Sequence, residues 1–378
     1  MSSLNASFNT TSISNFSHVS SISTTAIYDL LLIIFNSINL FACAQVVGVF
    51  GIVANILNIR LFRQQGYQDG VNITLTALAL SDIGALVNML VYITMLNPLI
   101  DENGVTVSKV AIGYVSFFLH EYFIKVSSVI ITFAAVERCL CVALPLKVKM
   151  MITAKLAVVV NGVIFIVMCL YLFVHFHIMF LSWDLLPETN QTVLRFHYKS
   201  IRVMYLPTAY YATDIFLPYC TFLVLISCSA IIFVKLKSKS KWRQSNSSWG
   251  DKLASLTYKE RKTAKLFMLV SVTCVVLLLP YYLMFTCTAF MRELAFDGAQ
   301  SVIGFLVSSF TTLLETINCS ITVFIYYNMS SKFRAEFRKM FGQWSKLNIR
   351  KTRQRVEIDF LEYLTPSADK NQHLSCTY

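Results

Sequence analysis

The stretch "VERCLCVALPLKVKM", residues 136–150, closes an apolar run that begins near residue 108. Glu137 and Arg138 stand side by side where the run ends, and a proline and two lysines follow. The hydrocarbon core of a membrane is about 30 Å thick and is crossed by about 20 helical residues. The run is therefore long enough to cross a membrane, with a charged pair at its end.

Further apolar runs of this kind occupy most of the chain. Of the 378 residues, 56% are hydrophobic and only 14% are charged, and the mean hydropathy is +0.61. This composition is too apolar for a soluble core, and the lack of short alternating segments excludes a membrane β-barrel. We predict an all-α membrane protein: a seven-transmembrane helix bundle followed by a short amphipathic cytosolic helix. The predicted spans are 33–62, 72–96, 108–140, 154–179, 208–235, 260–290 and 301–327.

Basic residues predict the orientation of the bundle. If the odd-numbered connections face the cytosol, these segments carry 26 of the 32 lysines and arginines, as the positive-inside rule requires. The net charge of +12 is then a topological signal, and nucleic-acid binding is not needed to explain it. We expect a multi-pass plasma-membrane protein with an extracellular glycosylated tail (1–32), a seven-transmembrane domain (33–327), and an amphipathic helix with a cytosolic tail (328–378).

The amino-terminal tail is rich in Ser, Thr and Asn and carries N-glycosylation sequons at Asn5, Asn9 and Asn15. Such tails also carry sequons by chance, but the predicted extracellular position favours the use of at least one. The tail has no signal-peptide pattern, so we expect the first span to serve as an uncleaved signal.

Polar residues inside the predicted spans are candidate functional groups, because an ionisable side chain at membrane depth is costly. Asp82 lies in the second span, and Asn55, Ser127 and Asn318 lie in the first, third and seventh. If the bundle brings them together, they can hydrogen-bond the carboxylate or hold a sodium ion through oxygen ligands. The alternative is a neutral, protonated Asp82 that serves only to pack the helices. No cofactor other than sodium is expected.

The order and spacing of several motifs give the chain a resemblance to rhodopsin-like (class A) G-protein-coupled receptors, across all seven spans. These motifs are Asn55, "LALSD" ending in Asp82, "ERC" at 137–139, Pro218, "KERKTAKLF" before Pro280, and "NCSITVFIYYNMSSKFRAEF" from the seventh span onward. Within that family, the chain looks most like divergent invertebrate chemosensory or neuropeptide-type receptors. The resemblance implies an extracellular small-molecule or peptide ligand and a heterotrimeric G protein as partners.

The resemblance also implies a role for the charged pair with which the quoted stretch begins. In the family, Arg138 and Glu260 correspond to an ionic latch between the third and sixth helices, and Glu137 pairs with the arginine locally. Such a pair suits a switch because the cost of desolvation nearly cancels the attraction, which leaves a small net energy for a ligand to overturn. The alternative is an ordinary salt bridge at two helix ends.

Two prolines and the segment after the last span complete this expectation. Pro218 and Pro280 remove backbone donors, so they are expected to kink the fifth and sixth helices. "SKFRAEFRKMF" places Phe333, Phe337 and Phe341 four residues apart among basic side chains, which is typical of a helix lying on anionic membrane lipids.

The chain also departs from the family pattern. Gly113 stands where the family usually has the cysteine of a disulfide to the second outer loop. Leu278 replaces the usual tryptophan before Pro280, and Ile226 replaces a tyrosine of the fifth helix. "TVFIY" replaces Asn-Pro-x-x-Tyr at 322–326 but retains Tyr326. A modified activation rearrangement follows from these changes.

The ligand site is expected around His120, which stands eighteen residues before Arg138, or about 27 Å along a helix. Glu121 and Lys125 have the i,i+4 spacing at which opposite charges neutralise each other. Asp214 and Glu315, with Tyr281 and Tyr282, would then form an acidic and aromatic pocket for a ligand with a cationic or hydrogen-bond-donating group. Equally open is a nearly neutral pocket in which Lys125 pairs with Asp214 and Glu315 is protonated.

Other protein classes are less consistent with the sequence. The seventh span contains no lysine to hold retinal, and no paired half-helices or pore-lining polar stripe indicate a transporter or channel. No HExxH, GxSxG, Walker or CxxC pattern indicates an enzyme. The strongest competing interpretation is a seven-span adaptor or scavenger that binds ligand without activating a G protein.

Overall fold

The chain folds as a bundle of long helices. The computed structural model describes residues 30–68, 70–97, 108–143, 153–186, 191–245, 251–291, 293, 301–340 and 342, without the side chains of 186, 191, 238–245, 251–260 and 301. Within this part of the chain, seven helices are long and apolar enough to cross a membrane, which confirms the predicted bundle. The spans are Leu30–Gln65, Gly70–Leu96, Lys109–Ala143, Ala154–His177, Arg202–Lys237, Arg261–Phe290 and Val302–Met329. The predicted sequons at Asn5, Asn9 and Asn15 lie outside the described residues.

Several spans are divided into more than one helical element. The first contains the π-helix η1 (Ser37–Ala44) and α2 (Gln45–Gln65), and the next three are α3 (Gly70–Leu96), α4 (Lys109–Ala143) and α6 (Ala154–His177). The fifth consists of α7 (Arg202–Tyr210), η2 (Tyr211–Phe216) and α8 (Leu217–Ser245). The sixth is α9 (Asp251–Phe290), and the seventh consists of α10 (Ser301–Ser320) and α11 (Thr322–Met329). The fifth span was predicted to begin at 208, but it begins at Arg202, because the helix continues through Pro207.

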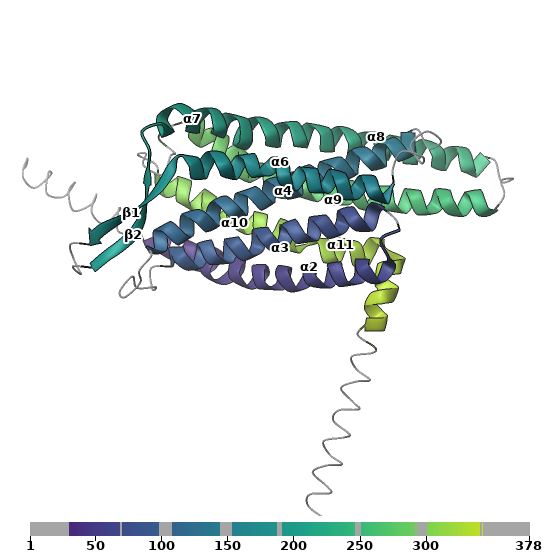
Figure 1. Cartoon of the computed structure of the whole chain (residues 1–378). Helices are drawn as coiled ribbons and strands as arrows, with labels where there is room; N and C mark the ends of the chain where they lie inside the picture. The colour runs from purple at the N-terminus through teal and green to yellow at the C-terminus, as the bar shows by residue number, and fades with distance from the viewer. Residues whose placement is uncertain are drawn as a thin grey trace, which may run out of the picture.

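The third span, α4, is the centre of the bundle. It packs against α3, α6, α8 and α9, and Figure 1 shows it running through the middle of the molecule. Because protein surrounds it, α4 can keep polar and charged side chains away from lipid. Those it buries include His120, Glu121, Lys125, Glu137 and Arg138.

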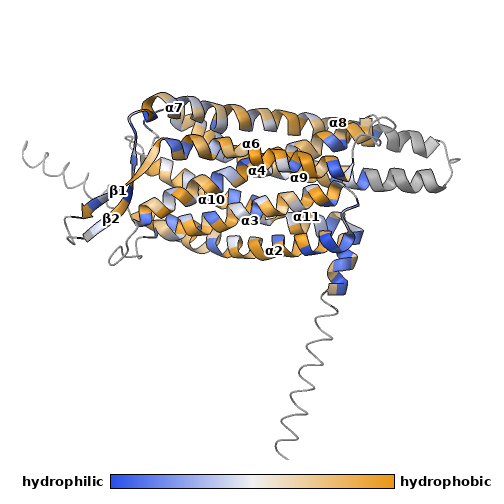
Figure 2. Ribbon diagram, viewed as in Figure 1, coloured by the Kyte–Doolittle hydropathy of each residue, from blue (hydrophilic) through white to orange (hydrophobic). Residues whose placement is uncertain are grey.

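The outer surface of the bundle is apolar, as a lipid-facing surface must be. Figure 2 shows hydrophobic residues along the whole length of the helices. Large side chains such as Val46, Ile166, Phe173 and Val276 are more than half exposed in the absence of lipid. Ile226, which replaces a family tyrosine, belongs to this outer surface, whereas Leu278 is buried in the core.

A β-hairpin covers one end of the bundle, which we call the hairpin end (Figure 1). Strand β1 (Met179–Leu186) pairs antiparallel with β2 (Gln191–Tyr198), with Met179 opposite Tyr198. The hairpin was not predicted from the sequence. Short β-prone segments around "PETN" at 187–190 carry the signal for it, because Pro and Asn favour turns.

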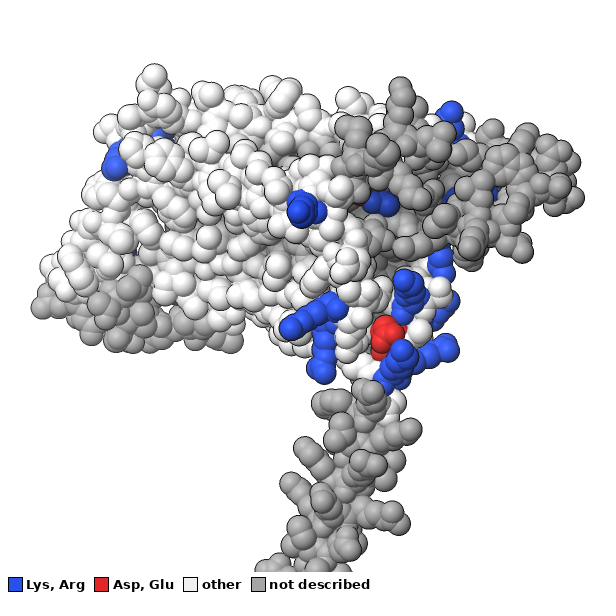
Figure 3. Space-filling view, turned by 45° about the vertical axis from the view of Figure 1, so that its right-hand side comes forward, with Lys and Arg blue, Asp and Glu red and all other residues white. Residues whose placement is uncertain are grey.

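The opposite end, which we call the basic end, carries most of the described lysines and arginines. A helix at 331–340 turns away from the long axis of the bundle there, and Figure 3 shows basic side chains gathered around it. Phe333 is fully buried and packs against Phe62 and Tyr326 at ring distances of 5.9 Å. Phe337 contacts Tyr327 at 5.3 Å, and Phe341 lies outside the described residues. The apolar side of this helix is therefore held by the bundle, while its basic side is exposed.

The seventh span breaks between α10 and α11 without a proline. Asn55 donates hydrogen bonds from its amide to the carbonyl oxygens of Cys319 (2.8 Å) and Gly51 (3.0 Å). Asn58 donates to the side chains of Asn55 (3.3 Å) and Thr322 (3.4 Å). These bonds satisfy polar groups at the break, so α2 supports the irregular part of the seventh span.

Gly51 allows α2 to approach α3 and α10 closely. A methyl group at this position would lie well inside contact distance of Ser320 Oγ and 2.7 Å from Leu86 Cδ1. We expect Gly51→Ala to lower the free energy of unfolding by about 1–3 kcal/mol, as overpacking does. Thermal unfolding of the detergent-solubilised protein measures this effect. Gly162→Ala is the control, because the corresponding methyl group in α6 meets nothing within 4 Å; equal effects of the two changes would contradict the argument.

Candidate functional site

A buried lysine joins two acids near the hairpin end. Lys125 Nζ lies 2.6 Å from Glu121 Oε2 and 3.0 Å from Asp214 Oδ1. Lys125 and Glu121 occupy successive turns of α4, and each is about 1% exposed. Both pairings that the sequence suggested for Lys125 are therefore present at once.

Local helix geometry brings Asp214 to this lysine. Asp214 lies in the π-helix η2, four residues before Pro218. Proline has no backbone N–H, so the carbonyl of Asp214 cannot receive its regular helical hydrogen bond, and the wider π turn precedes the proline. The side chain of Asp214 is buried and faces α4.

Aromatic side chains enclose the charged groups. The Tyr281 hydroxyl donates a hydrogen bond to Glu121 Oε1, and Lys125 Nζ lies 4.5 Å from the centre of the Tyr171 ring. Tyr281 also contacts Phe285 at a ring distance of 4.6 Å. The lysine is thus stabilised by two carboxylates and by the face of a ring, as a desolvated cation requires.

A second buried pair lies beside the first. The Nδ1 atom of His120 is 2.9 Å from the carbonyl oxygen of Ala85, and its Nε2 atom is 3.7 Å from Glu315 Oε2. A carbonyl only accepts hydrogen bonds, so Nδ1 carries a hydrogen. His120 and Glu315 are each about 1% exposed, and together they link α4 to α10.

A cavity of about 170 Å³ opens between these groups and the hairpin. Glu121, Asp214 and Tyr281 form its polar wall, and Phe118, Tyr171, His175, Met179, Tyr198, Tyr210 and Phe285 are among its other lining residues. Of the six predicted ligand residues, three line this cavity. His120, Lys125 and Glu315 lie outside its wall.

Sequence reasoning missed several residues of this cavity. Tyr171 and His175 are one turn apart near the end of α6, and Tyr210 donates a hydrogen bond to the Phe285 carbonyl at 2.7 Å. Aromatic residues at helical spacing usually indicate ordinary packing, so only their convergence in space identifies them as cavity residues.

Partial burial raises the pKa of Tyr198, at the base of the hairpin, so its hydroxyl stays neutral.

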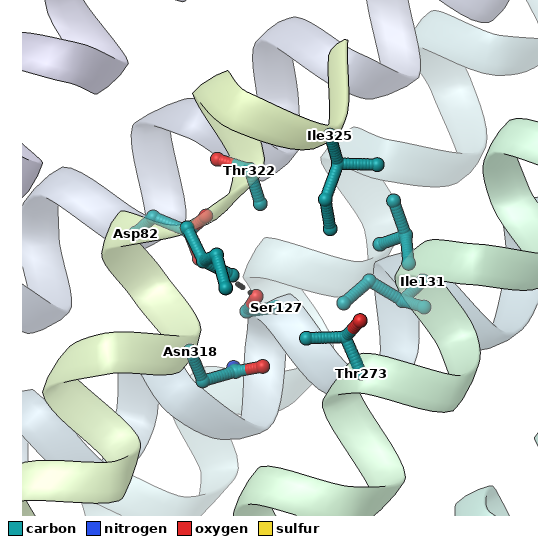
Figure 4. A pocket seen from close by; sticks show the side chains of 9 residues that line it. Asp82, Ser127, Ile131, Thr273, Asn318, Thr322 and Ile325 are labelled. Atoms are coloured by element: carbon teal, nitrogen blue, oxygen red, sulfur yellow. Dashed lines mark hydrogen bonds between the residues drawn. The ribbon is translucent and has the colours of Figure 1, made fainter. Parts of the chain in front are cut away.

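Asp82 occupies a separate polar site in the middle of the bundle. Ser127 donates a hydrogen bond to Asp82 Oδ1 at 2.9 Å, and Figure 4 shows Asn318, Thr273 and Thr322 around the same space. The cavity there is about 10 Å³, which is about the space one water molecule needs. The three predicted residues therefore meet, and their oxygens are suited to a small hard cation.

Arg138 lies near the basic end of α4. It pairs with the adjacent Glu137, and its guanidinium carbon is 6.0 Å from the centre of the Phe267 ring. The side chain of Glu260, its predicted partner, lies outside the described residues, so the latch stays a prediction. Tyr326 is fully buried between Phe62 and Phe333. Pro280 lies inside α9, as the sequence requires.

Among the described residues, the cysteines that are free thiols include Cys43, Cys139, Cys169, Cys220, Cys228, Cys274, Cys287 and Cys319. Gly113, at the position of the usual family cysteine, lies near Tyr92 and Met95. Contacts of the hairpin with α4 and α6 hold it against the helices instead.

The bundle of seven membrane-spanning helices is that of a multi-pass membrane protein. The family model for the serpentine type 7TM GPCR chemoreceptor Srw matches residues 39–344. The chain therefore belongs to this chemoreceptor family, and the match covers all seven spans except the start of the first. No curated protein matched the chain significantly.

Removal of the buried lysine tests the charged network. We expect Lys125→Met to lower the free energy of unfolding by about 3–5 kcal/mol, because Glu121 and Asp214 would be left buried without a cation. Surface expression and thermal unfolding measure the loss. The double variant Lys125→Met/Asp214→Asn should recover part of it.

The matched control is Lys339→Ala, which removes an exposed lysine that pairs with Glu336 at 2.9 Å. Exposed pairs of this kind contribute at most about 1 kcal/mol. A Lys125→Met protein as stable as the Lys339→Ala protein would contradict the network.

Proposed function

We propose that this chemoreceptor binds a small extracellular ligand in the cavity at the hairpin end and activates a heterotrimeric G protein at the basic end. The observation that carries the proposal is the position of α4. The same helix supplies Glu121 to the cavity wall and Arg138 to the opposite end. A shift of α4 relative to its neighbours is thus able to couple the two ends.

The proposal includes an extracellular amino terminus and a plasma-membrane location. It is supported by the bias of basic residues toward the end that carries α11 and the helix at 331–340. In this orientation the hairpin is the second extracellular loop, and the sequons at Asn5, Asn9 and Asn15 face the compartment where glycosylation occurs. The motif order from Asn55 to Tyr326 favours placement in the rhodopsin-like class.

The cavity favours a small ligand, or one side chain of a peptide. Its volume of about 170 Å³ is below the usual range for a drug-sized ligand, about 300–1,000 Å³. Three buried carboxylates stand near a single lysine, so a cationic or hydrogen-bond-donating group is the best electrostatic match. The aromatic walls suit the apolar part of such a ligand.

Signalling through Arg138 distinguishes this proposal from a seven-span adaptor or scavenger. In the inactive receptor, Arg138 is held by Glu137 and by Glu260 of α9. Outward movement of α9 about Pro280 releases the guanidinium toward the G protein. An adaptor with the same cavity has no use for this release.

Nucleotide exchange on co-expressed G proteins is the decisive experiment. We expect Arg138→Ala to lower exchange at least about tenfold, since coupling energies of about 1–3 kcal/mol correspond to about 5–150-fold. Lys199→Ala, which removes an exposed lysine near the hairpin that donates to the His177 carbonyl, is the control and should leave exchange unchanged. Equal exchange by wild type and Arg138→Ala across a panel of Gα subunits would favour the adaptor.

The proposal also assigns a sodium ion to Asp82, Ser127 and Asn318. Their oxygens surround a small enclosed space, and a sodium ion there would neutralise the carboxylate and hold the inactive arrangement of α3, α4 and α10. The competing interpretation is a neutral Asp82 held by Ser127 alone.

Sodium-dependent stability separates these interpretations. At a concentration of about 100 times the dissociation constant, a bound ion adds about 2.7 kcal/mol of stability. We therefore expect sodium chloride, but not potassium chloride of equal ionic strength, to raise the unfolding temperature of the wild-type protein. Asp82→Asn should remove the difference between the salts. A difference that persists in Asp82→Asn would place the ion elsewhere.

A further inference from the structure

Next to the ligand cavity, three ionisable side chains converge without forming a complete hydrogen-bond network. Each of His120, Glu121 and Glu315 is about 1% exposed, and one ligand atom from each lies within 4.8 Å of the other two. Among the described residues, His120 Nε2 and Glu315 Oε1 have no hydrogen-bond partner. Buried polar atoms are nearly always satisfied, so these two atoms indicate a missing partner.

We infer that His120, Glu121 and Glu315 bind a divalent transition-metal ion of the zinc class. Imidazole with carboxylates is a donor set that suits zinc, whereas calcium and magnesium prefer oxygen ligands alone. Two ligand atoms on one tetrahedral zinc ion lie about 3.3 Å apart, given bond lengths of about 2.0–2.1 Å. His120 Nε2 and Glu315 Oε2 are 3.7 Å apart, and all three ligand atoms lie within 4.8 Å of one another, so side-chain movements of at most about 1.5 Å bring them to this spacing.

Two of the three ligands, His120 and Glu121, already make the supporting hydrogen bonds that are typical of a metal site. His120 Nδ1–H donates to the Ala85 carbonyl, which leaves Nε2 with its lone pair directed at Glu315. Glu121 is held by hydrogen bonds from Tyr281 and Lys125. Metal-binding histidines usually donate their second ring N–H in this way, and ligating carboxylates are themselves hydrogen-bonded.

Charge balance favours a divalent ion. Glu121, Asp214 and Glu315 face a single lysine, which leaves a formal charge of −2 when His120 is neutral. Lys125 already contacts Glu121 and Asp214, so the charge of Glu315 is balanced by His120, by a proton of its own or by a bound cation. The alternative to a metal ion is a proton on His120 Nε2. The distance of 3.7 Å between Nε2 and Glu315 Oε2 is too long for a normal hydrogen bond, and this proton would leave Glu315 Oε1 without a partner.

The ion has a route to the site and a consequence once bound. Glu121 lines the cavity near the hairpin, so an ion in that cavity reaches the first ligand directly. His120 and Glu121 belong to α4 and Glu315 belongs to α10, so the ion would fasten these helices beside the ligand cavity. Binding itself does not depend on G-protein coupling and is testable without it.

Metal titration of the full-length receptor in lipid nanodiscs, after treatment with a chelator, tests the inference. We expect the wild-type protein to bind one Zn²⁺ ion and to unfold at a higher temperature with the ion bound. His120→Asn and Glu315→Gln should each weaken binding by more than about 100-fold, because the loss of a residue that only supports a ligand usually costs about 10–100-fold. In His120→Asn, the amide N–H replaces Nδ1–H toward the Ala85 carbonyl, while the Nε2 ligand is lost.

His197→Asn is the matched control, because His197 pairs with Asp184 at 2.9 Å on the partly exposed hairpin. It should leave the high-affinity site intact. Absence of a Zn²⁺ site in wild type, or equal affinity in wild type, His120→Asn and Glu315→Gln, would overturn the inference. If the two variants do not fold, Co²⁺ spectra of the wild-type protein decide: bands of nitrogen and oxygen ligation support the site, and a thiolate charge-transfer band overturns it.

Discussion

The contact of Lys125 with two carboxylates is the interaction on which the rest of this structure depends. In a bundle surrounded by lipid, a charged side chain is stable only if protein partners replace water. Lys125 meets this requirement through Glu121 on its own helix and Asp214 on the fifth span. The contact between Lys125 and Asp214 therefore fixes how α4 and η2 face each other. Glu121 in turn accepts a hydrogen bond from Tyr281, and both residues line one wall of the cavity.

The sequence predicted the spans and the polar residues inside them because membrane depth imposes a simple rule on composition. For this reason Asp82 could be grouped in advance with Asn55, Ser127 and Asn318, although Asn55 donates to the carbonyls of Gly51 and Cys319 instead. The family resemblance placed Arg138 near the end of its helix. The double contact of Lys125 could not be chosen over either single pairing, because the direction of Asp214 depends on a π turn that the composition does not reveal. The hairpin was not predicted because its strands, of 8 residues each, are too short to cross a membrane as helices, so hydropathy alone does not distinguish them from loops.

In the seventh span, side chains of α2 take the place of the usual proline at the junction of α10 and α11. The usual proline is absent between α10 and α11, and yet the helix breaks after Ser320. Asn55 and Asn58 of α2 bind the carbonyl of Cys319 and the hydroxyl of Thr322 at this break. This junction is thus supported by side chains from a neighbouring helix rather than by a proline of its own.

The π turn at η2 makes chain length as important as residue identity in the fifth span. An α-helix advances by 100° for each residue, so deletion of one residue between Tyr211 and Phe216 would restore regular winding. Asp214 would then rotate away from Lys125 although every functional side chain was still present. Insertions and deletions in this short segment would therefore change the wall of the cavity near the hairpin, and a comparison of chains by substitutions alone would overlook them.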